Sequence, residues 1–209
     1  MTQRKFVFVI ACSKKKLDGG GLASQMSDLS FSNILNPCRE ELLRKYINAG
    51  NAPLDWKRCM PAYDRYRGII YSAEVREKLI NNPENVLIVS ALFGLIKPHD
   101  LIPYYDLSMT KNLEGTRVNK FWRNEIENCH KCILNEALLT IKNQRPDILF
   151  VHLLPVDYQD AFCGFLKNSD SNRAHTHGNY IPYIMDPPNY LSYDTRGWWK
   201  KNYLSLHLM

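Results

Sequence analysis

Several patterns that would identify a protein class at once are missing from this 209-residue sequence. No apolar run approaches the ~20 residues that a membrane-spanning helix needs. The N-terminus also lacks the features of a signal peptide, because the apolar run at residues 6–11 is short and lysines follow it directly. The six cysteines are scattered and form no compact disulfide framework. We therefore expect a cytoplasmic protein with reduced thiols and no membrane partner.

Common cofactor and catalytic motifs are missing as well. The sequence has no GxxxxGK[ST] phosphate loop, no GxGxxG dinucleotide fingerprint and no GxSxG nucleophile elbow. Cys129 and Cys132 form a CxxC, but no second CxxC follows at zinc-ribbon spacing. His175 and His177 would complete a zinc site only if the fold brought them to that pair. We therefore expect no cofactor and no metal, with this zinc site as the open alternative.

Charge and aromatic content bear on the partner. The net charge is +6, and the chain has 12 tyrosines and 4 tryptophans. A basic balance favours an anionic partner, with nucleic acid first. Aromatic side chains suit stacking on bases, although they suit a protein core equally well. The composition indicates no oligomeric state.

Strands alternate with helices along the chain. Short apolar runs typical of strands buried on both faces stand at residues 5–11, 86–89 and 147–154. Amphipathic helices are expected at residues 37–49, 72–79 and 119–141, the last as one helix or two. Pro37 suits the first turn of the first of these helices. The pattern predicts one α/β domain over residues 1–209, with a mainly parallel sheet flanked by helices and an irregular, aromatic and basic tail at residues 168–209.

Polar side chains follow each predicted strand. Cys12 and Ser13 come directly after the first strand, and a lysine triplet follows them. The stretch 86–109 continues from its strand into a proline-rich segment with several ionisable groups, and Asp157 follows the third strand. Open α/β sheets place their sites beyond the carboxyl ends of the strands, so we expect these groups to form a site. A solvated loop after each strand is the plain alternative.

These residue types suit chemistry on a nucleic acid. A carboxylate near a sugar C1′ can stabilise an oxocarbenium ion and orient water. Lysines and backbone N–H groups would hold phosphates, and tyrosines would stack on a base, which would first have to leave a duplex. Together these parts would suit hydrolysis of an N-glycosidic bond in a nucleoside or a nucleic acid. A non-catalytic DNA-binding protein and a nucleoside or nucleotide enzyme remain open alternatives.

Two stretches carry a resemblance to a known family. The sequence CSKKK at residues 12–16 matches a C-S-x-x-K turn, and SALFGLIKPHDLIPYYDLSM at 90–109 matches an S-A-x-[YF]-G-L-[IV]-x-P…I-x-x-Y-x-L-x-M run. Both resemble the bacterial peroxide-stress protein family called YaaA, and Tyr71-Ser72 is similar to a segment between them. The resemblance implies DNA binding, protection from oxidative DNA damage and a three-layer architecture like that of uracil-DNA glycosylases. The glycosylase motifs G-x-D-P-Y and H-P-S-P are absent.

We therefore expect a DNA glycosylase that removes a damaged or modified base, in DNA repair or in defence against modified phage DNA. The expected catalytic groups are His99, Asp100 and Asp106, with either carboxylate as the stabiliser of the oxocarbenium ion. The residues expected to bind the substrate are Cys12, Ser13, Lys14, Lys15, Lys16, Tyr71, Ser90, Gly94, Tyr104 and Asp157. Those expected to contact the nucleic-acid backbone are Arg196, Trp198, Trp199, Lys200 and Lys201.

Overall fold

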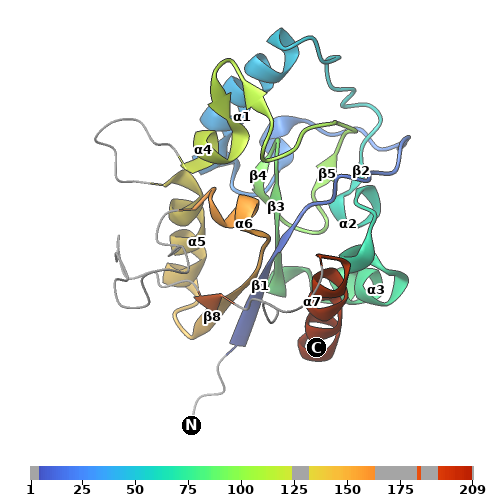
Figure 1. Ribbon diagram of the computed structural model, residues 1–209, viewed down its shortest axis with the longest axis vertical. Coiled ribbons are helices and arrows are strands. Elements are labelled where there is room, and N and C mark those ends of the chain that lie inside the picture. Colours follow the sequence, from blue (N-terminus) through green and yellow to red (C-terminus); the bar gives the residue numbers. More distant parts are fainter. Residues whose placement is uncertain (1–4, 124–131, 163–182, 185–192, 209) are drawn as a thin grey trace.

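A five-stranded sheet in the order β4-β3-β1-β8-β9 forms the centre of the molecule (Figure 1). The computed structural model describes residues 5–123, 132–162, 183–184 and 193–208. The strands of this sheet are β1 (Lys5–Ala11), β3 (Val86–Ser90), β4 (Gly94–Ile96), β8 (Ile148–Leu153) and β9 (Tyr183–Ile184). β1 pairs in parallel with β3 and with β8, and β8 pairs in parallel with β9. Only the β3–β4 pair of this sheet is antiparallel, so the sheet is mixed but mainly parallel.

The three strands expected from the apolar runs are confirmed. Every residue of β3 is buried, as are the last five residues of β1, because helices cover both faces of the sheet. The register sets Ile10 of β1 opposite Ile88 of β3 and Leu153 of β8. Since the three strands run parallel, their carboxyl ends lie at the same edge of the sheet.

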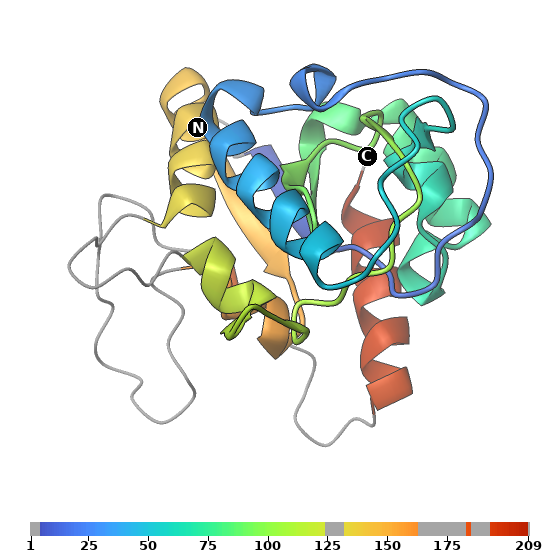
Figure 2. The same cartoon turned by 90° about the horizontal axis from the view of Figure 1, so that it is seen from above.

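Helices form a layer on each side of the sheet, as Figures 1 and 2 show. α1 (Ser32–Asn48) packs with α5 (Ile133–Gln144), and both contact the edge strand β4. α3 (Ala73–Asn81) and α7 (Tyr193–His207) pack together on the other side. The sequence therefore predicts the fold class correctly: α/β, with a sheet flanked by helices.

Short elements connect these layers. The small helices are α2 (Ala62–Arg65), α4 (Val118–Arg123) and α6 (Val156–Gln159), with 3-10 turns at Met26–Asp28, Ile69–Tyr71 and Pro83–Asn85. Two antiparallel pairs join β2 (Met60–Pro61) with β5 (Leu101–Ile102), and β6 (Asn112–Leu113) with β7 (Thr116–Arg117). Within the described ranges no helix is long and apolar enough to cross a membrane.

The structure corrects two predictions about helices. α1 begins at Ser32, before the predicted start, and therefore holds Pro37 inside the helix and not in its first turn. Leu35, in the added first turns, is fully buried, and its packing explains the earlier start. The tail predicted as irregular contains α7. That helix docks on α3, where the Lys78 Nζ donates a hydrogen bond of 3.2 Å to the Leu208 carbonyl.

Candidate functional site

The carboxyl ends of the parallel strands bring Cys12, Ser90 and Tyr158 close together. The Cys12 N–H, just past β1, donates to the carbonyl of Val89 in β3 at 2.9 Å. The Cys12 Sγ lies 3.1 Å from the Oη of Tyr158, which follows β8 on α6. The neighbouring Asp157 side chain is exposed at the same edge of the sheet. The expected convergence of strand ends is therefore present.

A chain of buried hydroxyl groups lies beneath this edge. The Phe93 N–H donates to the Ser90 Oγ at 3.0 Å, the Ser90 Oγ lies 2.8 Å from the Tyr105 Oη, and that oxygen lies 2.8 Å from the Tyr66 Oη. Tyr71 donates to the Ala11 carbonyl at 2.8 Å. Burial raises the pKa of Tyr66, Tyr71 and Tyr105 well above the usual value. These phenols therefore stay neutral and can donate hydrogen bonds.

The loop after β1 is fixed against residues 65–67. The Leu17 N–H donates to the Arg65 carbonyl at 2.8 Å, and the Ser13 Oγ donates to the Arg67 carbonyl. Arg65 is fully buried, and its guanidinium donates to carbonyl oxygens of Leu17, Arg58 and Ile102. This buried clamp sets the course of the loop, and the sequence prediction did not include it.

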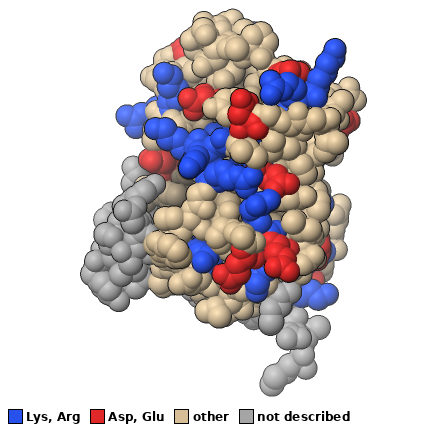
Figure 3. All heavy atoms as spheres, turned by 90° about the vertical axis from the view of Figure 1, so that its right-hand side faces the viewer, with Lys and Arg blue, Asp and Glu red and all other residues tan. Residues whose placement is uncertain are grey.

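The three lysines of this loop take different positions. Lys14 and Lys15 are exposed, whereas the Nζ of Lys16 is buried 4.3 Å from the centroid of the Tyr105 ring. Figure 3 faces the side on which β2, α2 and α3 lie in Figure 1 and shows Lys and Arg side chains gathered in a band across that face. Exposed positive charge in such a band attracts anions in general, and nucleic acid is a polymeric anion of this kind.

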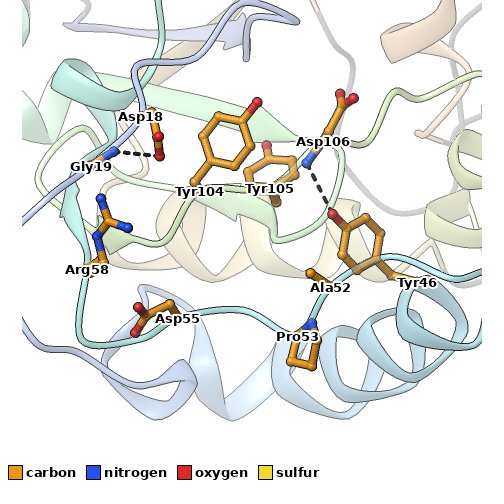
Figure 4. Close-up of a pocket in the computed structure, with 10 residues that line it drawn as sticks. All are labelled: Asp18, Gly19, Tyr46, Ala52, Pro53, Asp55, Arg58, Tyr104, Tyr105 and Asp106. Carbon is orange, nitrogen blue, oxygen red and sulfur yellow. Dashed lines mark hydrogen bonds between the residues drawn. The ribbon is translucent and has the colours of Figure 1, made fainter.

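A cavity of about 230 Å³ opens beside this loop (Figure 4). One wall is formed by Asp18 and Gly19, and the opposite one by the segment after α1, residues 52–55. Tyr104, Tyr105 and Asp106 complete the lining together with Tyr46 and Arg58. The Tyr46 hydroxyl accepts a 3.2 Å hydrogen bond from the Asp106 N–H, which fixes the backbone at the pocket. The pocket thus combines an exposed phenol, three carboxylates (Asp18, Asp55 and Asp106) and a guanidinium.

Only Asp106 of the three expected catalytic residues lines this pocket, where its side chain is exposed. The carboxylate of Asp100 accepts hydrogen bonds from the Ser30 N–H at 3.0 Å, the Ser30 Oγ at 2.8 Å and the Lys97 N–H at 3.0 Å. Burial raises the pKa of Asp100, and these hydrogen bonds oppose the rise. His99 is exposed elsewhere, with its Nε2 3.2 Å from the Ile80 carbonyl oxygen.

Gly94 has a backbone role in the structure. Its φ is +65°, in the region that favours glycine, and an added Cβ would lie 3.0 Å from the Trp122 ring and 3.1 Å from Leu134. The Trp122 Nε1 donates to the Ala91 carbonyl at 2.8 Å. Gly94 therefore permits the β3–β4 turn and the approach of α4.

The residues expected to contact a nucleic-acid backbone face in different directions. Trp198 is 53% exposed, and the Nζ of Lys201 lies 4.9 Å from its ring centroid and 3.5 Å from the Glu74 Oε2. Lys200 is buried and donates to the Leu154 carbonyl at 2.9 Å, and Trp199 stacks on Tyr203. The side chain of Arg196 lies outside the described residues.

The zinc alternative falls largely outside the described residues, because Cys129, His175 and His177 are not among them. Cys132 is buried, and its Sγ donates to the Ala161 carbonyl at 3.3 Å. In the described part of the chain, no cluster of three His, Cys, Asp or Glu side chains could hold a metal ion.

Part of this sequence is similar to known proteins. The UPF0246 protein of Rickettsia rickettsii (strain Iowa) is 29% identical over 136 residues, which are 58% of this chain and 55% of that protein. A UPF0246 protein of Fusobacterium nucleatum is 24% identical over 177 residues, 78% of this chain and 70% of the relative. The chain thus spans about half the length of the Rickettsia relatives it matches. A family model described as "Peroxide stress protein YaaA" matches residues 21–169, more than half of the chain, and the chain therefore belongs to the YaaA peroxide stress protein family.

Proposed function

We propose that this protein binds DNA in the response to peroxide stress and receives an unstacked base in the pocket at Tyr104 and Asp106. The observation that carries the proposal is the position of this pocket. It lies beside the loop after β1, so that an exposed aromatic ring, a carboxylate and a basic loop adjoin one another. The family description supports the stress role.

Each part of the pocket has a role in this proposal. The Tyr104 side chain is 46% exposed and offers a ring face for stacking, which contributes roughly 1–3 kcal/mol per base in single-strand binding. Lys14 and Lys15 are exposed on the adjoining loop and would contact phosphates. The cavity of about 230 Å³ is smaller than the ~300–1,000 Å³ of sites for drug-sized ligands, which suits one base and not a whole nucleotide.

We infer a three-layer architecture like that of uracil-DNA glycosylases. Four parallel strands with a helical layer on each side support it, together with a pocket near the carboxyl ends of the strands.

Hydrolysis of an N-glycosidic bond is the second candidate function, and Asp106 favours it. Its carboxylate is exposed in the pocket and forms no ion pair within the described residues. A free carboxylate there could stabilise positive charge on the sugar or orient water. Incubation with DNAs that carry oxidised or otherwise modified bases should produce abasic sites, and Asp106→Asn should abolish them. A panel of bound substrates that yields none would refute this candidate.

Binding itself is tested by fluorescence anisotropy with labelled single-stranded and duplex oligonucleotides. Tyr104→Ala should weaken single-strand binding about 5- to 150-fold, the equivalent of one lost stacked base. Phe6→Ala is the matched control, because Phe6 is 44% exposed but lies near the opposite end of β1. Equal effects of the two variants would remove Tyr104 from the interface. Tight binding of free nucleotides without DNA binding would instead favour a nucleotide enzyme.

A further inference from the structure

Lys16 differs from the two lysines before it. Its backbone forms a bridge with Tyr66, and its side chain turns inward, so that the Nζ has almost no contact with solvent although the residue as a whole is partly exposed. Among the residues that the structure describes, this ammonium group has no hydrogen-bond partner. Within the described residues it forms no ion pair either. An amine in this position is not explained by solubility or by a structural ion pair.

The surroundings of Lys16 are aromatic. Its Nζ lies 4.3 Å from the ring centroid of Tyr105 and 6.0 Å from that of Tyr66. Such contacts stabilise a desolvated cation, but by less than its burial costs. Burial accordingly lowers the pKa of Lys16, while Cys12 and Asp106 oppose the shift. A desolvated lysine with a lowered pKa holds more of the neutral, nucleophilic amine at neutral pH.

The pocket lies one side chain away from this amine. Tyr105, whose ring the Nζ faces, lines the pocket, and Asp106, also in the lining, is close enough to act on Lys16 electrostatically. The four-carbon side chain of lysine can carry its amine past one ring by rotation of its own torsions. A carbonyl group held in the pocket would therefore be within reach.

We propose that the Lys16 Nζ is a nucleophile that forms an imine with the C1′ aldehyde of an abasic deoxyribose in DNA bound at this pocket. The inference rests on the proposed DNA binding but not on the glycosidic step. An abasic site fits because its open-chain sugar presents an aldehyde where a base would otherwise occupy the pocket.

This reaction changes no oxidation state that would need a cofactor. The lone pair of the neutral amine attacks C1′ and gives a carbinolamine, which loses one water molecule to form the C=N bond. Loss of the C2′ proton, with Asp106 as the nearby carboxylate that could accept it, then breaks the bond from C3′ to the phosphate oxygen. The 3′ phosphate leaves with the electron pair. Water hydrolyses the remaining imine and returns the free amine.

Borohydride trapping tests this step on the full chain. The probe is a labelled oligonucleotide whose single uracil has been removed beforehand by a separate glycosylase. It therefore already contains an abasic site, and the assay does not require this protein to excise a base. Sodium borohydride should reduce the imine and give a covalent protein–DNA band, and mass spectrometry should place the adduct on Lys16. Lys16→Arg should reduce trapping at least 50-fold. Lys57→Arg, at an exposed lysine next to the pocket residue Arg58, should trap like the wild type.

The outcomes separate this inference from the proposed function. DNA binding by Lys16→Arg at wild-type affinity shows that the variant is folded, and Lys16→Met provides a second variant if it is not. DNA binding without trapping in the wild type, or an adduct on Lys14 or Lys15, overturns the inference and leaves DNA binding intact. Failure to bind any DNA overturns the proposed function itself.

Discussion

His152 makes the stability of this protein depend on pH in a way that can be calculated. It lies on β8 between β1 and β9, fully buried, with its ring 5.4 Å from that of Phe162. Burial lowers its pKa from 6.5 to about 3. In the unfolded chain the imidazole binds a proton below pH ~6.5, whereas in the folded protein it stays neutral until about pH 3. The unfolded state therefore gains stability as the pH falls through this window.

The magnitude follows from linkage. Full stability is present above pH ~6.5, and between pH 7 and pH 5 the free energy of unfolding should fall by about 2 kcal/mol on account of His152 alone. This is a large part of the ~5–15 kcal/mol that stabilises a typical domain. His152→Phe keeps an apolar ring of similar size and removes the titrating group.

Urea denaturation followed by circular dichroism at both pH values measures the effect. The other ionisable groups contribute equally to the two proteins, so the wild type should lose about 2 kcal/mol more than His152→Phe between pH 7 and pH 5. The comparison uses the difference between two pH values, which cancels any constant effect of the substitution on packing. An equal loss in both proteins would refute the reasoning.

Three further substitutions test the roles of individual residues, each by urea denaturation at pH 7. Asp100→Ala should lower the free energy of unfolding by about 2–4 kcal/mol, because it removes the acceptor of three hydrogen bonds. Asp106→Ala, at an exposed side chain, should change it by less than ~0.5 kcal/mol, and a larger loss would indicate a structural carboxylate. Gly94→Ala should cost about 2–3 kcal/mol from the positive φ and the clash with Trp122, and wild-type stability would show that the turn rearranges.

The strands and their common edge could be predicted from the sequence because continuous apolar runs leave few alternatives. Alternation was also informative: from residue 104 to 108 the side chains are exposed and buried in turn, which places Tyr104 outside and Tyr105 inside. Without that pattern, the sequence does not distinguish the exposed tyrosine from the buried one. The sequence analysis used only the first of them, although Tyr105 connects Ser90 to Tyr66 and faces Lys16.

The sequence alone could not show that Asp100 and Asp106 have different roles. Asp100 is held by Ser30, 70 residues earlier in the chain, and a partner at that distance leaves no local pattern. The helix α7 was missed for a similar reason. Gly197 interrupts its pattern, yet glycine suits that position because an added Cβ would lie 3.2 Å from the Ile69 side chain. Tertiary packing therefore decided both cases.

The salt dependence of DNA binding tests the central claim most directly. If the loop after β1 contacts phosphates, the logarithm of the association constant should fall linearly with that of the salt concentration. Combined Lys14→Ala and Lys15→Ala substitutions should reduce the slope for duplex DNA by up to about 2, near 0.9 for each lost contact. Lys5→Ala, at the exposed start of the same strand, should leave the slope unchanged. A wild-type slope near zero, or equal slopes for the double variant and the wild type, would contradict the account.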